Sequence, residues 1–166
     1  MNIIYVTTTK TDVYEFVKQK LEKDFNICGV AFKRTLKGKP YIENGNIYFN
    51  VTHSKDFTAV AIGKAQVGID AEYLGTADLR VIKRFTKPEQ DYIREDDSNN
   101  RFFEIWTKKE AYLKYKGVGL SGGLKSFNVL ETPQMFKSFV IGKFIVTVCS
   151  DGQYRMEDKN EIRQSL

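Results

Sequence analysis

Short runs of β-branched and aromatic residues recur along this chain, and only a few segments between them have helical periodicity. The first such run covers residues 2–7. A helix is predicted from Asp12 to about Asp24, with Thr11 and Asp12 as capping residues and apolar side chains at helical spacing. Further strand-like runs follow at 27–34, 57–62 and 67–72. The order is therefore strand, helix, then several strands.

The second part of the chain repeats this order. Two short helical stretches precede a strong helix that ends at Gly117, and strand-like runs follow; the ranges are 78–85, 88–93, 101–116, 126–130, 135–141 and 143–150. We interpret the chain as two related halves packed together, an N-terminal half over 1–64 and a C-terminal half over 65–150. Residues 151–166 are expected to form a polar tail.

A β-hairpin is predicted early in the chain. Tyr41-Ile42 and Ile47–Phe49 flank a four-residue segment that contains Asn44-Gly45. Asn-Gly favours a type I′ turn, which matches the twist of a hairpin.

Composition indicates a folded globular protein with an anionic partner. The 166 residues are 42% hydrophobic, 13% aromatic and 28% charged, which is not the composition of a disordered chain. Lysine and arginine number 26 against 21 acidic residues, a net charge of +5. This excess suits a nucleic acid, a phosphorylated small molecule or an acidic protein. No long basic block occurs, so a dedicated nucleic-acid-binding protein is less favoured.

Cysteine usage and hydropathy exclude several other classes. Cys28 and Cys149 show no CxxC spacing and no histidine cluster, so zinc and thioredoxin chemistry are unsupported, and two buried reduced thiols are expected. The N-terminus lacks a basic segment followed by a long apolar one. No apolar run approaches the roughly 20 residues that span a bilayer. The sequence therefore predicts a cytoplasmic protein without a membrane segment.

Two carboxylates share one face of the predicted strand at 67–72. Alternate residues of a strand point the same way, so Asp70 and Glu72 lie on one face and Ile69 and Ala71 on the other. Paired carboxylates of this kind suit Mg²⁺, which commonly uses one or two of them together with substrate phosphates. An isolated Asp-x-Glu is more often a solvated acidic face, so this signal alone does not decide the function.

The helix predicted at 101–116 has a glutamate on its apolar side. Glu110 projects within the apolar arc that includes Phe103 and Trp106, and Lys114 stands one turn further on. A carboxylate aimed at a core is costly without a cation or a hydrogen-bond partner. The ordinary alternative is a surface Glu–Lys pair that stabilises the helix by a few tenths of a kcal/mol, but such a pair belongs opposite Trp106.

Two weaker signals concern phosphate binding. The single histidine, His53, follows Thr52 near Lys39-Pro40, a set that can bind phosphate oxygens, although a lone histidine is more often structural. The glycines that follow the helix allow close approach of a ligand, but they also simply end helices. They match neither a P-loop nor a dinucleotide-binding pattern.

Together these signals resemble the phosphopantetheinyl transferase superfamily, in its surfactin-synthetase-activating type. The resemblance runs from about Gly38 to Val129 and rests on Gly38-Lys39-Pro40, Phe49-Asn50-Val51-Thr52-His53-Ser54, Gly68-Ile69-Asp70-Ala71-Glu72, and Trp106-Thr107-Lys108-Lys109-Glu110 with Lys114, Gly117, Gly119 and Leu120. It implies an α+β fold of two pseudo-symmetric halves, each a small antiparallel sheet packed on a long helix.

The resemblance also implies an activity and its site. The 4′-phosphopantetheine of coenzyme A would be transferred to a serine of an acidic apo carrier protein of fatty-acid, polyketide or nonribosomal-peptide synthesis, releasing 3′,5′-ADP. Asp70, Glu72 and Glu110 would bind Mg²⁺. Glu110, or a water on the metal, would take the serine proton, and Lys114 would stabilise the leaving group. Residues that match phosphate-binding positions are Lys39, Pro40, Thr52, His53 and Lys114, while Trp106 would be a core residue.

Other readings stay open. The part before Gly38 is shorter than in the two-half enzymes that the chain resembles, and Lys33, Arg34 or Lys37 would have to supply basic contacts there. A non-catalytic module that binds coenzyme A or phosphate is the main alternative. A nucleic-acid-binding domain is favoured only by charge. Two halves within one chain predict a monomer.

Overall fold

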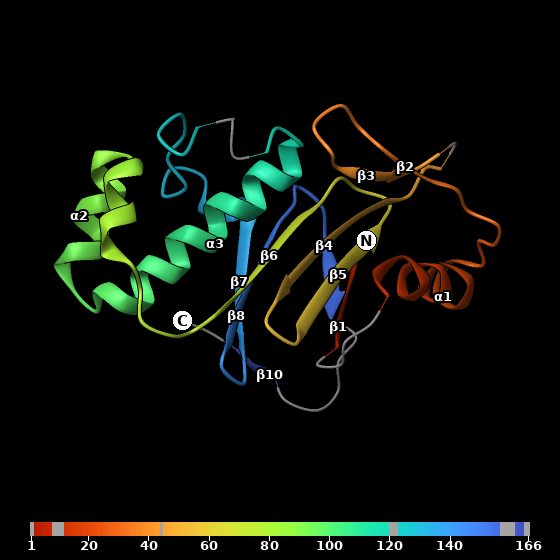
Figure 1. Ribbon diagram of the computed structural model, residues 1–166, viewed down its shortest axis with the longest axis horizontal. Helices are drawn as coiled ribbons and strands as arrows, with labels where there is room; N and C mark the ends of the chain where they lie inside the picture. The colour runs from red at the N-terminus through yellow and green to blue at the C-terminus, as the bar shows by residue number, and fades with distance from the viewer. Residues whose placement is uncertain (1, 8–11, 44, 120–122, 157–161, 165–166) are drawn as a thin grey trace.

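The computed structural model describes residues 2–7, 12–43, 45–119, 123–156 and 162–164, and it contains two four-stranded sheets with helices outside them (Figure 1). The first sheet has the order β4-β5-β1-β9, built from Tyr48–Ser54, Phe57–Gly63, Asn2–Thr7 and Tyr154–Met156. Its neighbours pair antiparallel except β9, which runs parallel to β1. The N-terminal strand therefore lies inside the sheet, between β5 and a strand from the far end of the chain.

The second sheet is antiparallel throughout. Its order is β10-β7-β8-β6, from Ile162–Gln164, Phe136–Ile141, Phe144–Cys149 and Gly68–Tyr73. A two-stranded ribbon of β2 (Phe32–Arg34) and β3 (Pro40–Ile42) lies beside the first sheet. The expected polar tail thus contributes two three-residue strands, one to each large sheet.

Each large sheet carries a helix on its outer side, with caps that follow from the sequence. In α1 (Val13–Phe25) the Asp12 side chain accepts a hydrogen bond from Glu15 N, as predicted. The helix α3 (Ser98–Lys116) ends where expected, at Gly117 in the left-handed region with φ 70°. Around it lie the 3₁₀ helix η1 (Leu79–Arg84), α2 (Lys87–Glu95) and the short η3 (Pro133–Met135).

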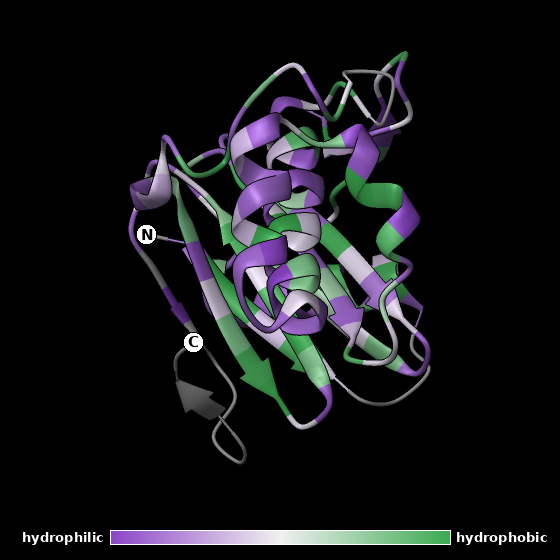
Figure 2. Cartoon of the chain, turned by 90° about the vertical axis from the view of Figure 1, so that its left-hand side faces the viewer, coloured by the Kyte–Doolittle hydropathy of each residue, from purple (hydrophilic) through white to green (hydrophobic). Residues whose placement is uncertain are grey.

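Three hydrophobic clusters fill the spaces between these layers. One joins α1 to the first sheet, one lies between the inner faces of the two sheets, and one joins α2 and α3 to the second sheet. Figure 2 shows largely hydrophobic strands behind helices in which hydrophilic and hydrophobic residues alternate. Among the helices of the described ranges, none combines the length and apolar character that a bilayer crossing needs. The predicted α+β class, with small antiparallel sheets and helices, is confirmed, whereas the pseudo-symmetry and the domain boundaries stay predictions.

Several local predictions were wrong. The strands expected on either side of Asn44-Gly45 do not pair with each other, because β3 pairs with β2 and β4 pairs with β5; Asn44 itself lies outside the described residues. No strand forms at 126–130, where backbone groups bond instead to the side chains of Lys109 and Glu89. Cys149 is buried as expected, but Cys28 is exposed.

Candidate functional site

The acidic strand β6 and the helix α3 approach each other closely because β6 begins with a glycine. A Cβ atom at Gly68 would lie 2.0 Å from Ala111 O and 2.5 Å from Tyr115 N, both backbone atoms of α3. Any side chain there would have to push the helix away from the strand. The glycine of the Gly-Ile-Asp-Ala-Glu segment therefore sets the distance between the strand and the helix.

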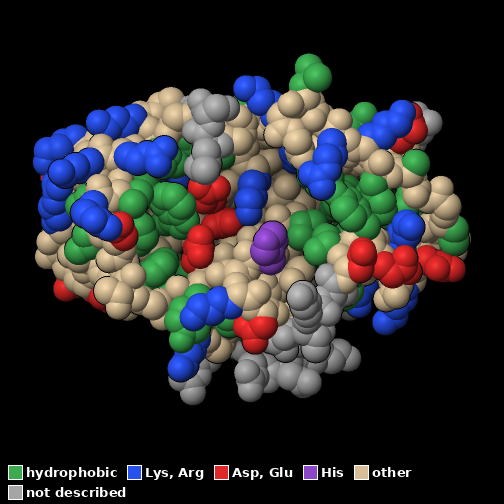
Figure 3. All heavy atoms as spheres, viewed as in Figure 1, with side chains coloured by type: hydrophobic (Ala, Val, Ile, Leu, Met, Phe, Trp, Pro, Cys, Tyr) green, Lys and Arg blue, Asp and Glu red, His purple; other side chains and the backbone are tan. Residues whose placement is uncertain are grey.

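The close packing brings Asp70 and Glu72 to the residues of α3. Asp70 is buried, and its Oδ1 accepts hydrogen bonds from Lys114 Nζ at 2.7 Å and from Thr52 Oγ1 at 3.2 Å. Glu72 accepts from Trp106 Nε1 at 3.0 Å through Oε1 and from Ser54 Oγ at 3.4 Å through Oε2. As the strand periodicity predicts, the two carboxylates share one face of β6, while Ile69 and Ala71 join the hydrophobic cluster between the sheets. Figure 3 shows acidic side chains grouped next to the histidine near the middle of one face.

Glu110 belongs electrostatically to the same group. Burial, then the negative charge of Asp70 and to a smaller degree that of Glu72, raise the pKa of Glu110 to about 7, against the opposing positive charges of Lys114 and Arg84. The pKa of Asp70 is also raised, chiefly by burial, although Lys114 opposes the rise. The chain therefore holds several carboxyl groups close together in a partly dehydrated place, where their simultaneous ionisation is disfavoured.

Two oxygens of this group have no hydrogen-bond partner. They are Asp70 Oδ2 and Glu110 Oε1, and both are buried. Buried polar atoms are nearly always paired in native proteins, so an unpaired carboxylate oxygen indicates a missing ligand. Hard oxygen donors with excess negative charge suit a divalent cation such as Mg²⁺. Within the described ranges, however, no three His, Cys, Asp or Glu side chains already form a metal-binding group.

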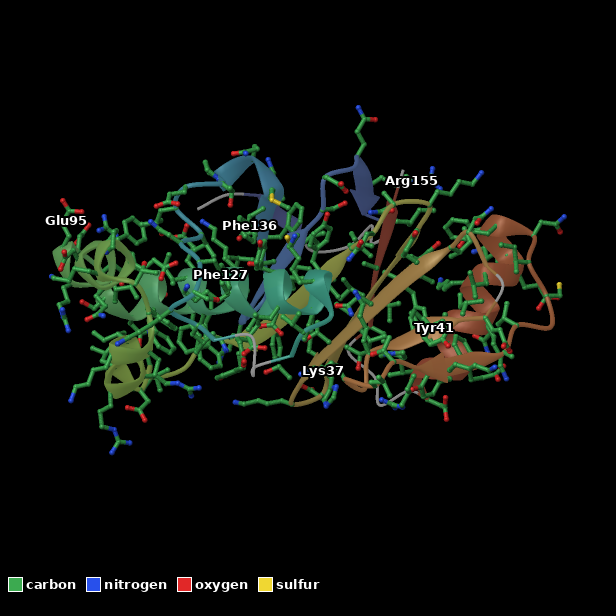
Figure 4. The ribbon with its side chains drawn as sticks, turned by 90° about the horizontal axis from the view of Figure 1, so that it is seen from above. Lys37, Tyr41, Glu95, Phe127, Phe136 and Arg155 are labelled. Atoms are coloured by element: carbon green, nitrogen blue, oxygen red, sulfur yellow. The ribbon has the colours of Figure 1, made fainter. Side chains whose placement is uncertain are left out.

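A pocket of about 230 Å³ lies next to the carboxylates, between the β2–β3 ribbon and the end of α3. Among the described residues its lining includes three lysines and no acidic residue: Lys37, Gly38, Lys39, Pro40, Asn50, Val51, Leu113, Lys114, Gly117 and Gly119. Figure 4, seen from above, shows Lys37 near the C-terminal end of α3 and Phe127 beside that helix. Such a lining suits an anionic ligand.

Some residues that the sequence predicted at a phosphate site make other contacts. Lys39 Nζ donates to the backbone oxygens of Lys114 and Tyr115, at 2.6 and 3.1 Å, so it caps the C-terminus of α3. Burial lowers the pKa of Lys39. Thr52 faces Asp70, whereas His53, the next residue, is exposed. Trp106, expected in the core, is half-buried and stacks against Phe102.

The structure shows contacts of residues for which the sequence analysis predicted no role. Asn50 and Ser54 bond to β6 together with Thr52, and their spacing at alternate strand positions was a usable signal. Arg84 from η1 contributes positive charge to Glu110, which no local pattern indicated. Leu120 of the family pattern lies outside the described residues.

Comparison with known proteins identifies the family. A model of the 4′-phosphopantetheinyl transferase superfamily matches residues 66–156. The chain is 33% identical over 103 residues to 4′-phosphopantetheinyl transferase gsp of Aneurinibacillus migulanus, a match that covers 59% of this chain and 43% of that protein. It is 35% identical over 103 residues to psf-1 of Bacillus pumilus, covering 59% and 44%.

A third relative, 4′-phosphopantetheinyl transferase HetI of a Nostoc species, is 37% identical over 116 residues, which are 63% of this chain and 48% of HetI. The chain spans about half the length of the curated relatives that it matches. The family match alone takes in more than half of the chain, including both carboxylates of β6 and all of α3. This chain belongs to the 4′-phosphopantetheinyl transferase superfamily.

Proposed function

We propose that the chain transfers the 4′-phosphopantetheine moiety of coenzyme A to a serine of an acidic apo carrier protein and releases 3′,5′-ADP. The observation that carries the proposal is the pair of unpartnered buried oxygens, Asp70 Oδ2 and Glu110 Oε1, beside a pocket lined by three lysines. Membership of the superfamily and the similarity to proteins named 4′-phosphopantetheinyl transferases support it.

The binding roles divide between the two sides of the site. Asp70, Glu72 and Glu110 would hold Mg²⁺, which when bound neutralises charge on the pyrophosphate of coenzyme A. Lys114 and Lys37 reach the pocket with positive charge and bind the phosphate oxygens, Lys114 on the side that faces Asp70. Lys39 keeps the end of α3 in place and contributes positive charge to the same wall.

The chemical step is a displacement at phosphorus. The serine oxygen of the carrier forms a bond to the phosphorus that bears the pantetheine, and the bond from that phosphorus to the bridging oxygen breaks, so that 3′,5′-ADP leaves with the electron pair. Glu110 accepts the serine proton. Lys114 stabilises the charge that develops on the leaving phosphate.

The test mixes the purified chain with coenzyme A, Mg²⁺ and a panel of apo acyl and peptidyl carrier proteins, and measures the carriers by intact mass. We expect a mass gain of one phosphopantetheine that disappears with EDTA and with Asp70→Ala. Asp91→Ala is a matched control, because Asp91 lies on the exposed face of α2, where it pairs with Lys87. Transfer that persists in Asp70→Ala at the wild-type rate would contradict the role of the carboxylates.

A second candidate is a coenzyme A-binding module without turnover. Two observations favour it: the ammonium group of Lys114 already contacts Asp70, and the described side chains form no complete metal-binding group. Carriers of every type left unmodified, together with coenzyme A binding measured by calorimetry, would support this candidate. The cytoplasmic location, the acidic partner and the monomeric state stay predictions.

A further inference from the structure

The two large sheets meet along β4 and β6, and side chains rather than backbone groups make the hydrogen bonds there. Three side chains of β4 accept from three backbone N–H groups of β6. Asn50 Oδ1 accepts from Ile69 N at 2.9 Å, Thr52 Oγ1 from Ala71 N at 3.1 Å, and Ser54 Oγ from Tyr73 N at 3.2 Å. We call these three side chains the inter-sheet seam.

The seam side chains bind backbone N–H groups on the edge of β6 that faces away from its own sheet. The other edge of β6 pairs with β8, so alternate N–H groups of β6 point away from its own sheet. Buried backbone donors need partners, and the seam supplies one for each of Ile69, Ala71 and Tyr73. The alternation of Asn50, Thr52 and Ser54 matches this spacing because every second residue of a strand faces the same way.

Two of the three seam residues also contact the acidic side chains. A hydroxyl group can accept one hydrogen bond and donate another at the same time. Thr52 accepts from Ala71 N and donates to Asp70 Oδ1, and Ser54 accepts from Tyr73 N and donates to Glu72 Oε2. Asn50 bonds to β6 in the same way, but among the described side chains it contacts no carboxylate. The seam thus contains its own internal control.

We propose that Thr52 and Ser54 are positioning residues that fix the orientation of Asp70 and Glu72 for a divalent cation. The inference rests on the proposed function. The Thr52 hydroxyl and Lys114 both donate to Oδ1 of Asp70, while Oδ2 is buried and has no partner. Groups that hold metal-binding side chains in place typically change metal affinity 10- to 100-fold when removed. Thr52, expected from the sequence to contact phosphate, acts instead through Asp70.

The experiment measures Mn²⁺ binding alone, without coenzyme A, by titration calorimetry and by electron paramagnetic resonance of the free ion. Thr52→Val keeps the shape of the side chain and removes the hydroxyl group, so its Kd should rise by about 10- to 100-fold. Ser54→Ala should show a smaller rise, since its contact to Glu72 is longer. Thr52→Ser restores the hydroxyl group and should bind within about twofold of the wild type.

Asn50→Leu separates positioning from simple joining of the sheets. It removes one seam bond and no carboxylate contact, so it should lower the melting temperature while the Kd for Mn²⁺ stays within about twofold. Wild-type affinity in Thr52→Val would overturn the proposal. An equal loss of affinity in Asn50→Leu would also overturn it, because the seam would then act only by holding the fold together.

If the wild-type chain binds no Mn²⁺, the metal-binding part of the proposed function is contradicted. The positioning role of Thr52 would then be tested by structure determination. Crystal structures of Thr52→Val and Asn50→Leu would then be compared. We expect the Asp70 side chain to change its rotamer in the first variant only. An unchanged Asp70 in Thr52→Val would overturn the positioning role.

Discussion

Lys109 and Glu110 are adjacent in α3, yet they enter two buried charged clusters of opposite character. The ammonium group of Lys109 donates to Leu124 O, Phe127 O and Glu89 Oε2 at 2.6, 2.7 and 2.9 Å, so each of its three hydrogens has an acceptor. Glu89 in turn accepts from two backbone N–H groups. Glu110, in contrast, has a buried oxygen without a partner.

The difference separates a charged pair that maintains the fold from a cluster that we propose binds a ligand. The Lys109–Glu89 pair has no exposed side-chain surface and ties α2, α3 and the segment before β7 together. Its complete set of partners leaves nothing for a ligand to bind. The cluster around Glu110 and Asp70 carries like charges and unmatched oxygens, and such local inconsistencies concentrate at functional sites.

The largest expected effect concerns the incomplete cluster. Glu110→Gln removes the proposed general base and cation ligand but keeps the size of the side chain, so transfer to a carrier serine should fall by about 10²- to 10⁴-fold. The melting temperature should stay equal or rise, because a buried negative charge is removed. Carrier mass against time and circular dichroism give the two readouts. Full activity in Glu110→Gln would remove this residue from the mechanism.

The complete cluster should respond in the opposite way. Glu89→Gln leaves Lys109 charged and buried without its counter-charge, which should lower the free energy of unfolding by about 3–5 kcal/mol. Glu89→Gln combined with Lys109→Met removes both charges and should recover part of that loss. Urea denaturation followed by tryptophan fluorescence measures both. If Glu89→Gln lowers the free energy of unfolding by less than about 1 kcal/mol, the proposed difference between the two clusters is wrong.

The pH dependence of stability sharpens the comparison further. In the metal-free chain the pKa of Glu110 is raised from 4.5 to about 7, so between these values the folded state binds more protons than the unfolded state. The free energy of unfolding should therefore fall as pH rises through this window. Denaturation in EDTA at several pH values measures the slope, and Glu110→Gln should reduce it to the part that the raised pKa of Asp70 contributes. A slope of the opposite sign in the wild type would contradict the raised pKa.

The smallest effect is expected for Lys108, the residue that precedes Lys109 in α3. Lys108 pairs with Glu104 one turn earlier in α3, and these side chains keep 15% and 18% of their surface exposed, whereas Lys109 and Glu89 have none. Lys108→Ala should cost about 1 kcal/mol, less than Glu89→Gln, because the remaining Glu104 keeps some contact with solvent and the hydrogen bond from the Tyr92 hydroxyl. A cost as large as that of Glu89→Gln would show that burial does not distinguish these neighbouring lysines.

The sequence predicted those parts of the site that depend on one element alone. The alternation in β6 placed Asp70 and Glu72 on one face, and the helical projection of α3 put Glu110 away from the polar side. The capping of α1 by Asp12 and the end of α3 at Gly117 follow from local chemistry in the same way. The resemblance to the family then indicated that these separate elements form one site.

Contacts between distant elements could not be predicted. Thr86-x-x-Glu89 reads as an ordinary capping pattern, and only the tertiary fold buries Glu89 against Lys109. Asn-Gly predicted a hairpin because turn chemistry is local, whereas strand pairing placed β3 on β2. The contact of Thr52 with Asp70 joins two sheets, and no short pattern reports which strand edge will face which.

The close approach at Gly68 has a consequence for how such a site could change over time. The gap between the carboxylates of β6 and Glu110 is governed by a residue that has no side chain and binds nothing. A methyl group at position 68 would widen that gap without any change in the carboxylates themselves. The width of the site thus depends on the absence of a side chain at position 68. A requirement for a ligand of a given size would therefore constrain this glycine as strongly as the carboxylates.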